Sequence, residues 1–342
     1  MQLPFEEEYR KAYHEKIEQI FDSNFWSEGK MVREFEDRFS EYINCPSLAV
    51  SNGGAGLLAI FDYINVKDSD VIVPSNTFWA TSVAAKKAGG NVVYADCNKY
   101  DLCISLDSIK RLLTPKTKAV VVVHIGGHIA FDIEEIADFC NNNNLYLVED
   151  CAHAHGAVYM GKMAGVWGFA GAYSFYSTKT MPTGEGAMVC SKNSGFLEWL
   201  KLYRNYGKHV VDGHVEYLIT NGFNYRMNEF TAALGIVQLE RLSVILEYKQ
   251  MLADKFDKIF DNKVEFTKGM ISGYYKYIVF DYELKEQTGQ VFGPLDLGHH
   301  IEKVNQVLPN AEWIAEHHKC VPIYYGWNKS EWPLDKLREA LI

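Results

Sequence analysis

The chain has 342 residues, of which 48% are hydrophobic, and a formal net charge of -10. This length and composition predict one large and one smaller domain around a substantial buried core. The acidic balance disfavours a nucleic-acid role that depends on neutralising phosphates, although a few local donors can still bind a small anion.

Cysteine usage and the N-terminal residues indicate a cytoplasmic protein. The 7 cysteines are scattered and none are spaced as CxxC, which argues against a zinc ribbon or a disulfide framework. Residues 1–8 contain neither the basic nor the apolar part of a signal peptide, and no apolar run reaches membrane-spanning length. We therefore expect no membrane partner and no nucleic-acid partner.

Alternating apolar runs and amphipathic stretches predict an α/β fold with a mainly parallel sheet. Two amphipathic helices come first, and strands then alternate with helices as far as the middle of the chain. Strands are expected at 47–50, 71–73, 92–95, 118–124, 145–149, 171–176 and 186–191, and helices at 5–24, 31–43, 53–64, 79–88, 105–113, 132–143, 194–207 and 227–261.

The last third of the chain is expected to form the smaller domain. A strand over 274–281 would begin a new, smaller sheet, with helices around 295–307 and 335–341. We place the boundary in the long helix before this strand. The prediction is therefore a large domain over 1–240 and a small C-terminal α/β domain over 241–342.

A glycine-rich turn follows the first predicted strand and opens a helix. Exposed amides and the positive helix end around Gly54 would attract a phosphate. Gly54, Gly56 and Ala59 also fit the dinucleotide fingerprint, and Asp68 or Asp70 falls where a ribose-binding acid would lie. Three interpretations stay open here, namely a phosphate site, a nicotinamide cofactor and a tight turn without a ligand.

A strongly apolar strand ends in two acids and is followed by two histidines. Groups at the carboxyl ends of strands point into the ligand crevice of an open α/β sheet, so Asp150 is placed to touch a ligand. An aspartate can hold a pyridine nitrogen protonated, which makes a pyridoxal ring an electron sink. His153 could donate to a ligand oxygen, whereas His155 is expected to be a satisfied core histidine. A metal site of these two with His124 and His128 lacks the helical HxxxH pairing and is disfavoured.

Lys179 lies on a turn between the strands predicted at 171–176 and 186–191. Dry or cationic surroundings would remove the proton from its amine and make it a Schiff-base nucleophile. Alone, this turn would be interpreted as a surface hairpin loop. Together with Asp150 and the glycine turn at 53–56, it supplies the amine of a three-part site that also has a ring partner and a phosphate anchor.

The sequence resembles the sugar aminotransferases of the DegT/StrS type, which are pyridoxal-phosphate (PLP) enzymes of fold type I. The resemblance covers most of the chain, and its motifs occur in the family's order at 25–29 with 35–36, 51–55, 74–78, 149–156, 174–186 and 224–235. It implies a large domain with a mainly parallel mixed sheet flanked by helices, a smaller C-terminal α/β domain, and pyridoxal 5'-phosphate (PLP/PMP) as cofactor.

The resemblance implies a role for each matching residue at the ring. Lys179 would form the Schiff base with the cofactor and later move the proton in the 1,3-shift. Asp150 would pair with the pyridinium nitrogen, and His153 would contact the ring hydroxyl. Phe78 matches the aromatic residue that stacks on the ring face.

Further matching residues concern the phosphate and a second subunit. The backbone of Gly54 and Ala55, with the Ser174 hydroxyl, would hold the phosphate. Asn224 and Arg226 match the segment that reaches into the neighbouring subunit's site, which implies a homodimer with shared active sites. The family usually has threonine where this chain has Gly54, so one phosphate contact is missing.

The activity implied is transfer of an amino group, with L-glutamate as donor, to a nucleotide-linked keto sugar for surface polysaccharide or a related glycoconjugate. Amination at C3 and at C4 are both compatible with the motifs. A sugar dehydratase of the same family is an alternative, but that branch has histidine at the position of Lys179. A nicotinamide-dependent oxidoreductase and a non-enzymatic relative are the remaining alternatives. The chain departs from the family at Ala187, at Tyr206 and most strongly after residue 281.

Overall fold

The computed structural model describes residues 4–342, and its centre is a seven-stranded sheet of order β1-β9-β8-β5-β4-β2-β3. Strands β3, β2, β4, β5 and β8 are parallel neighbours, whereas β9 runs antiparallel to both β8 and β1. The predicted mainly parallel sheet is confirmed. Its strands are β1 (Ser47–Val50), β2 (Asp70–Pro74), β3 (Asn91–Ala95), β4 (Thr117–Val123), β5 (Tyr146–Asp150), β8 (Ala170–Ser174) and β9 (Ala187–Cys190).

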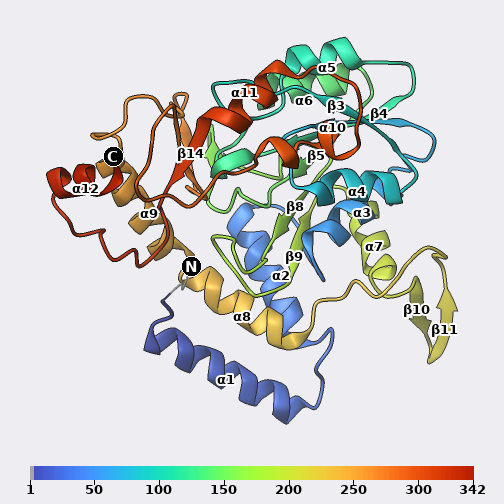
Figure 1. The fold of residues 1–342 in the computed structure, drawn as a ribbon. Helices are drawn as coiled ribbons and strands as arrows, with labels where there is room; N and C mark the ends of the chain where they lie inside the picture. Colours follow the sequence, from blue (N-terminus) through green and yellow to red (C-terminus); the bar gives the residue numbers. More distant parts are fainter. Residues whose placement is uncertain (1–3) are drawn as a thin grey trace.

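Helices surround this sheet (Figure 1). Those predicted before residue 194 occur close to their expected bounds, because amphipathic spacing and local turn signals agree there. The α-helices are α1 (Glu7–Ser23), α2 (Lys30–Ile43), α3 (Gly53–Tyr63), α4 (Trp79–Lys87), α5 (Leu106–Leu112), α6 (Ile133–Asn142), α7 (Ser194–Tyr203), α8 (Glu229–Glu240), α9 (Leu242–Phe256), α10 (Gly298–Ile301), α11 (Pro309–His317) and α12 (Leu334–Leu341).

Several predictions in the second half of the chain were wrong in extent. The helix expected over 227–261 is interrupted at Arg241, which separates α8 from α9. The helix expected at 295–307 consists of the 3-10 turn Pro294–Asp296 and the short α10. The strand expected at 274–281 is limited to β13 (Tyr277–Phe280), which pairs antiparallel with β14 (His318–Val321).

Two small sheets, the strand β14 and the helix α11 were not predicted. Strands β10 (Lys208–Val211) and β11 (His214–Tyr217) form a hairpin that extends away from the body of the molecule in Figure 1. Strands β6 (Val158–Tyr159), β7 (Lys162–Met163) and β12 (Met270–Ile271) form a second small sheet. Helix α11 leads directly into β14, and the amides of Asn310 and Ala311 at its start donate to the carboxylate of Asp96, directly after β3, at 3.1 and 2.8 Å.

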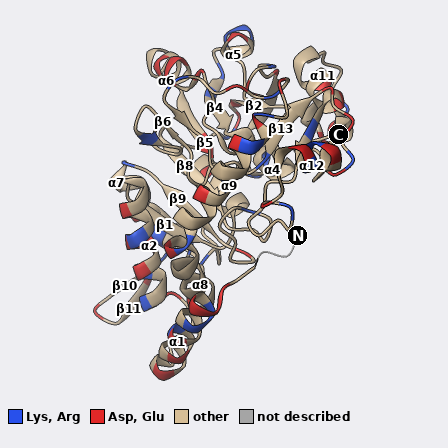
Figure 2. Ribbon diagram, turned by 90° about the vertical axis from the view of Figure 1, so that its left-hand side faces the viewer, with Lys and Arg blue, Asp and Glu red and all other residues tan. Residues whose placement is uncertain are grey.

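Close packing of α3 on the sheet depends on a glycine. A Cβ atom at Gly56 would lie 2.8 Å from Cγ2 of Val189, which real Cβ atoms do not tolerate. Helix–sheet packing therefore explains why glycine is needed at Gly56, the second glycine of the apparent dinucleotide fingerprint. Charged side chains lie mainly on the surrounding helices and loops, and most of the sheet is uncharged (Figure 2).

Two hydrophobic clusters form the core. The larger one contains the central sheet with its helices, and the smaller one packs α9 against β13 and α12. All 7 cysteines are buried and unpaired. None of the helices in residues 4–342 combines the length and the apolar character that crossing a membrane requires. The division of the chain at residue 240 stays a prediction.

Candidate active site

A cavity of about 850 Å³ lies at the carboxyl ends of β4, β5 and β8, the edge where open α/β sheets bind ligands. Its volume is within the range of cofactor and small-molecule sites. Among the predicted site residues it is lined by Gly54, Phe78, Asp150, His153, Ser174 and Lys179. The sheet therefore brings together residues that lie far apart in the sequence.

Lys179 lies on the loop between β8 and β9, as predicted. Its backbone amide donates to the carbonyl of Tyr176 at 2.9 Å, and Gln238 on α8 donates to the carbonyl of Pro182 at 2.7 Å, which fixes the loop. Burial lowers the pKa of the Lys179 amine to about 8, with a contribution from the charge of Lys276 and against the attraction of Asp150. The amine is therefore poised to lose its proton.

Asp150 is held at the end of β5 with its carboxylate fixed. The hydroxyl of Thr81 donates to Oδ2 at 2.8 Å, and the amide of Ala152 donates to Oδ1 at 3.1 Å. Thr81 in turn shares a 2.9 Å hydrogen bond with Thr77. No ion pair joins Asp150 to Lys179 within 4.0 Å in residues 4–342, although both line the cavity and the charge of Asp150 acts on the Lys179 amine.

Phe78 is 78% exposed and lines the cavity, where its ring is available for the stacking role that the resemblance implies. The loop before it is rigid. Asn76 donates to the carbonyl of Leu102 at 2.6 Å, and the Ser75 hydroxyl lies 2.6 Å from Nδ1 of His299. An exposed aromatic ring on a fixed loop is suited to stacking on a flat ligand.

One end of the cavity has the features of a phosphate site. The side chain of Ser174 lies over Gly53, since a Cβ added there would be 3.6 Å from the serine Oγ. Helix α3 begins at Gly53, so the amide of Gly54 has no intrahelical acceptor. The amide of Ala55, by contrast, donates to Oδ1 of Asn52 at 2.9 Å, and Ala55 does not line the cavity.

The two histidines after β5 differ in environment. His153 stacks on Tyr275 with ring centroids 4.1 Å apart, and its Nδ1 is buried with no hydrogen-bond partner in residues 4–342. Burial, and then the charge of Lys179, keep the pKa of His153 well below its usual value, so the ring is neutral. His155 is buried as predicted, but neither ring nitrogen has a partner within the described part of the chain, so "satisfied" was wrong.

Asn224 and Arg226 are not brought into this cavity within one chain. Asn224 is exposed, and Arg226 donates to Oδ1 of Asn205 in a separate surface hollow that also includes Phe25. The segment stays near the glycine turn, because the amide of Ser51 donates to the carbonyl of Tyr225 at 2.7 Å.

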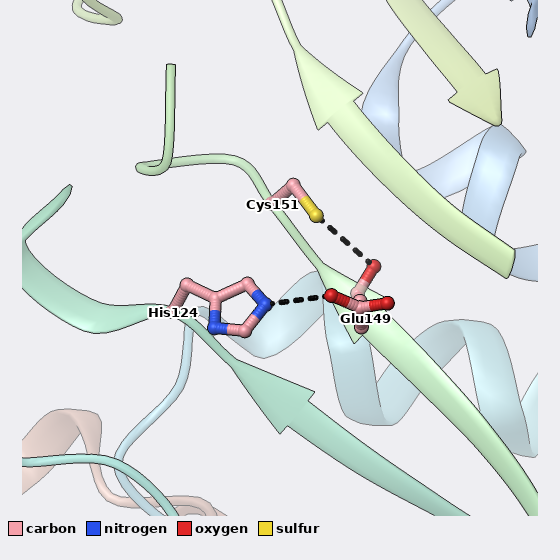
Figure 3. A group of neighbouring side chains, drawn as sticks. All are labelled: His124, Glu149 and Cys151. Carbon is pink, nitrogen blue, oxygen red and sulfur yellow. Dashed lines mark hydrogen bonds and ion pairs between the residues drawn. The ribbon is translucent and has the colours of Figure 1, made fainter. Parts of the chain in front are cut away.

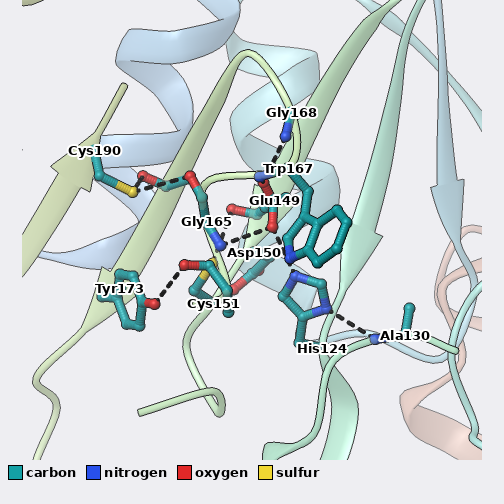
Figure 4. A network of polar contacts seen from close by, with 12 residues as sticks. His124, Ala130, Glu149, Asp150, Cys151, Gly165, Trp167, Gly168, Tyr173 and Cys190 are labelled. Carbon is teal, nitrogen blue, oxygen red and sulfur yellow. Dashed lines mark hydrogen bonds and ion pairs between the residues drawn. The ribbon is translucent and has the colours of Figure 1, made fainter. Parts of the chain in front are cut away.

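Glu149, one residue before Asp150, is fully buried and holds the end of β5 in place (Figures 3 and 4). The amides of Gly165, Trp167 and Gly168 donate to its carboxylate at 2.7, 2.8 and 2.7 Å. Nε2 of His124 lies 3.0 Å from the same carboxylate. Four hydrogen-bond donors therefore stabilise one buried carboxylate next to the site.

The same network accounts for a cluster with metal-like spacing. His124, Glu149 and Cys151 lie close together, but Nδ1 of His124 accepts from the amide of Ala130 at 3.1 Å. The proton of this imidazole is therefore on Nε2, which donates to Glu149. The Glu149 carboxylate is already occupied by these donors, and the absence of a histidine metal site stays a prediction.

The nicotinamide interpretation of the glycine turn is wrong. Strand β1 before the turn lies at the sheet edge and is antiparallel to its neighbour, unlike the first strand of a dinucleotide-binding unit. Asp70 is at the amino end of β2, opposite the cavity edge. Its carboxylate accepts from Asn91 at 2.7 Å and from Thr114 at 2.8 Å, so it is not free for a ribose.

The residues around the cavity fit pyridoxal phosphate. They supply an amine of lowered pKa, a fixed carboxylate, an exposed aromatic ring and a free helix-end amide beside a serine hydroxyl. Nδ1 of His153 adds a buried polar atom that lacks a partner in residues 4–342. The fold and this set of groups define a PLP-dependent transferase of fold type I.

The chain belongs to the DegT/DnrJ/EryC1/StrS aminotransferase family, whose model matches residues 7–278. GDP-perosamine synthase of Vibrio cholerae is 36% identical over 230 residues, which span 67% of this chain and 62% of that protein. GDP-perosamine synthase of Escherichia coli O157:H7 is 32% identical over 257 residues, 74% of this chain and 70% of that protein. The structure of the aminotransferase TlmJ from Streptoalloteichus hindustanus superimposes with a TM-score of 0.87 at 26% sequence identity. The match covers 98% of this chain and 96% of the TlmJ chain.

Sequence reasoning missed four residues that the structure places at the site. Thr81 orients Asp150, and Tyr275 stacks on His153. Lys249 and Lys276 line a smaller cavity next to Lys179. The sequence signals for these residues were weak, because a single threonine or lysine in a helix, or a lysine before a strand, is ordinary without its spatial neighbours.

Proposed function

We propose that this enzyme transfers an amino group from L-glutamate to the keto carbon of a nucleotide-linked sugar in the cytoplasm. The amino-sugar nucleotide formed would serve polysaccharide or related glycoconjugate synthesis. The observation that carries the proposal is the poised amine of Lys179, which lines one cavity with Asp150 and the neutral His153. The relatives that make GDP-perosamine support a nucleotide sugar as acceptor.

When bound, pyridoxal phosphate carries the amino group between the two half-reactions and delocalises the electrons released at the reacting carbon. Asp150, oriented by Thr81, provides the negative charge that stabilises a protonated ring nitrogen. Phe78 offers the stacking surface, and His153 offers Nδ1 to the ring oxygen. The amide of Gly54 and the hydroxyl of Ser174 face the phosphate end.

Lys179 has two tasks in this proposal. As a neutral amine it would hold the cofactor covalently and give way to the amine of the donor. Its free Nζ would then accept a proton as a general base and return it as a general acid. Its lowered pKa suits both tasks, because the amine exchanges a proton near neutral pH.

A panel assay tests the proposal. The purified protein, supplied with pyridoxal phosphate and L-glutamate, is incubated with keto-sugar nucleotides that differ in nucleotide and in keto position. We expect 2-oxoglutarate and one amino-sugar nucleotide to form in equal amounts, measured by mass spectrometry. Conversion of glutamate without amination of any sugar nucleotide would contradict the proposed acceptor.

Replacing Asp150 with alanine is expected to weaken cofactor binding about 10- to 100-fold, the effect of losing one charge-assisted hydrogen bond. The dissociation constant is measured by titrating cofactor-free protein with pyridoxal phosphate and following protein fluorescence. The control is Asp138→Ala, which removes an exposed carboxylate on α6. Unchanged affinity in the Asp150 variant would exclude its pairing with the ring.

The proposal includes a homodimer in which Asn224 and Arg226 complete the site of the other subunit. Exposed apolar side chains near this segment support it, since Trp26 is 54% and Phe223 is 58% exposed. Co-expressed Lys179→Ala and Arg226→Ala subunits should then recover about a quarter of the wild-type activity, because half of the dimers are mixed and each has one intact site. No recovery would show that each subunit works with its own residues.

A further inference from the structure

A second, smaller cavity of about 190 Å³ adjoins the site. It shares Thr178, Lys179 and Tyr275 with the larger cavity, so Lys179 lies where the two meet. Helices α8 and α9 and the C-terminal residues 323–325 form its other walls. A molecule with its reacting amine at Lys179 would therefore have its remaining atoms within reach of this cavity.

The lining of the smaller cavity is cationic. Lys179, Arg241, Lys249 and Lys276 all contribute to it, and no acidic residue does. Arg241 is accounted for, because it pairs with Glu6 at 2.9 Å. The three lysines have no carboxylate within 4.0 Å anywhere in residues 4–342. Three lysine amines thus surround one small space without a carboxylate partner among residues 4–342.

Lys249 is the most unusual of these lysines, because only 5% of it is exposed. Its Nζ donates to the hydroxyl of Thr180 and to the carbonyl of Tyr274, each at 3.1 Å, and both acceptors are neutral. Burial, and then the charge of Lys276, lower the pKa of Lys249 to about 7. A buried amine without an anionic partner is costly, so such a group is typical of a binding site.

Lys276 is less buried than Lys249. Its Nζ donates to the carbonyl of Thr288 at 3.3 Å, and its charge also depresses the pKa of Lys179. An anion between Lys249 and Lys276 would pair with both amines and offset the repulsion of Lys179 by Lys276. The cavity is smaller than the roughly 300–1,000 Å³ of sites for whole drug-sized ligands, so a complete nucleotide does not match it.

We propose that Lys249 and Lys276 bind a carboxylate of the amino donor and thereby select a dicarboxylic amino acid and its 2-oxo acid. The inference rests on the proposed transamination. An amino acid carries its amine a few bonds from a carboxylate, as the joined cavities require, whereas a sugar nucleotide carries phosphates far from its keto carbon. The side-chain carboxylate of a glutamate-like donor would pair with both lysines, whereas alanine has no such group and would leave them unpaired.

Calorimetric binding of glutarate, a dicarboxylate that has neither an amine nor a keto group, tests the site directly. The holoenzyme is titrated with glutarate and, separately, with a nucleoside diphosphate. Lys276→Gln and Lys249→Met should each raise the glutarate dissociation constant at least about tenfold, the loss of one charged contact. Nucleoside diphosphate binding should change less than about twofold. Lys268→Gln removes an exposed lysine and should change neither constant.

Two results would overturn the proposal: unchanged glutarate binding in both variants, or selective loss of nucleoside diphosphate binding, which would assign the lysines to the nucleotide. Thermal melts establish that each variant is folded, and Lys276→Gln carries the test if Lys249→Met is not. Failure of the proposed function can be distinguished from failure of this donor-site proposal. Lysine-dependent glutarate binding with no sugar nucleotide aminated would remove the acceptor and keep the donor site.

Discussion

Replacing Lys179 with alanine is expected to lower the transamination rate by at least about 10²–10⁴-fold, the contribution of one positioned acid–base group. The variant loses both the covalent hold on the cofactor and the proton carrier. No other lysine amine lines the larger cavity in residues 4–342, so none can replace it there. Turnover with L-glutamate and the yellow colour of the bound cofactor should disappear together.

Two controls separate this loss from misfolding. Lys268→Ala removes an exposed lysine and should keep full activity. Borohydride reduction of the wild-type enzyme, followed by peptide mass spectrometry, should place the phosphopyridoxyl group on Lys179. A coloured, active Lys179→Ala enzyme, or a modified peptide from another part of the chain, would refute the assignment.

Replacing Glu149 with alanine is expected to lower the unfolding free energy by about 3–5 kcal/mol, because four buried donors lose their acceptor at roughly 1–3 kcal/mol each before the structure relaxes. The substitution leaves three backbone amides and the Nε2 proton of His124 without their buried acceptor. Each orphaned donor carries a desolvation cost. Urea denaturation followed by circular dichroism measures the difference.

Glu149→Gln is the size-matched variant, and its amide group would oppose one of the same donors. It should therefore also destabilise the protein, but by less than alanine. Glu247→Ala, at an exposed position of α9, should stay within about 0.5 kcal/mol of wild type. Wild-type stability of Glu149→Ala would show that the network is not required to hold β5.

The chemical centre of the site could be predicted because position in a parallel sheet determines where side chains meet. Asp150 follows an apolar strand and Ser174 ends another, so both had to lie at the carboxyl edge of the sheet. The role of Ala55 was less predictable. An amide at a helix start is free for a ligand only if the N-cap side chain does not accept from it. The side chain of Asn52 accepts from the amide of Ala55, so this amide is not free.

The parts that could not be predicted depend on contacts between distant segments. Tyr275 reaches His153 across more than a hundred residues, and α10 fixes Ser75 through His299. The local periodicity of the sequence does not predict contacts between residues so far apart. The second half of the chain was also misjudged in extent, because short elements such as α10 and β14 are stabilised by packing more than by their own propensity.

The seven buried thiols can report local unfolding of the enzyme. Burial raises the pKa of the Cys151 thiol well above its usual value, so this thiol stays protonated and unreactive in the folded chain. Cysteines occur on strands, helices and the C-terminal segment alike. The rate at which a chromogenic thiol reagent colours a sample therefore reports how often these regions open, without any engineered label.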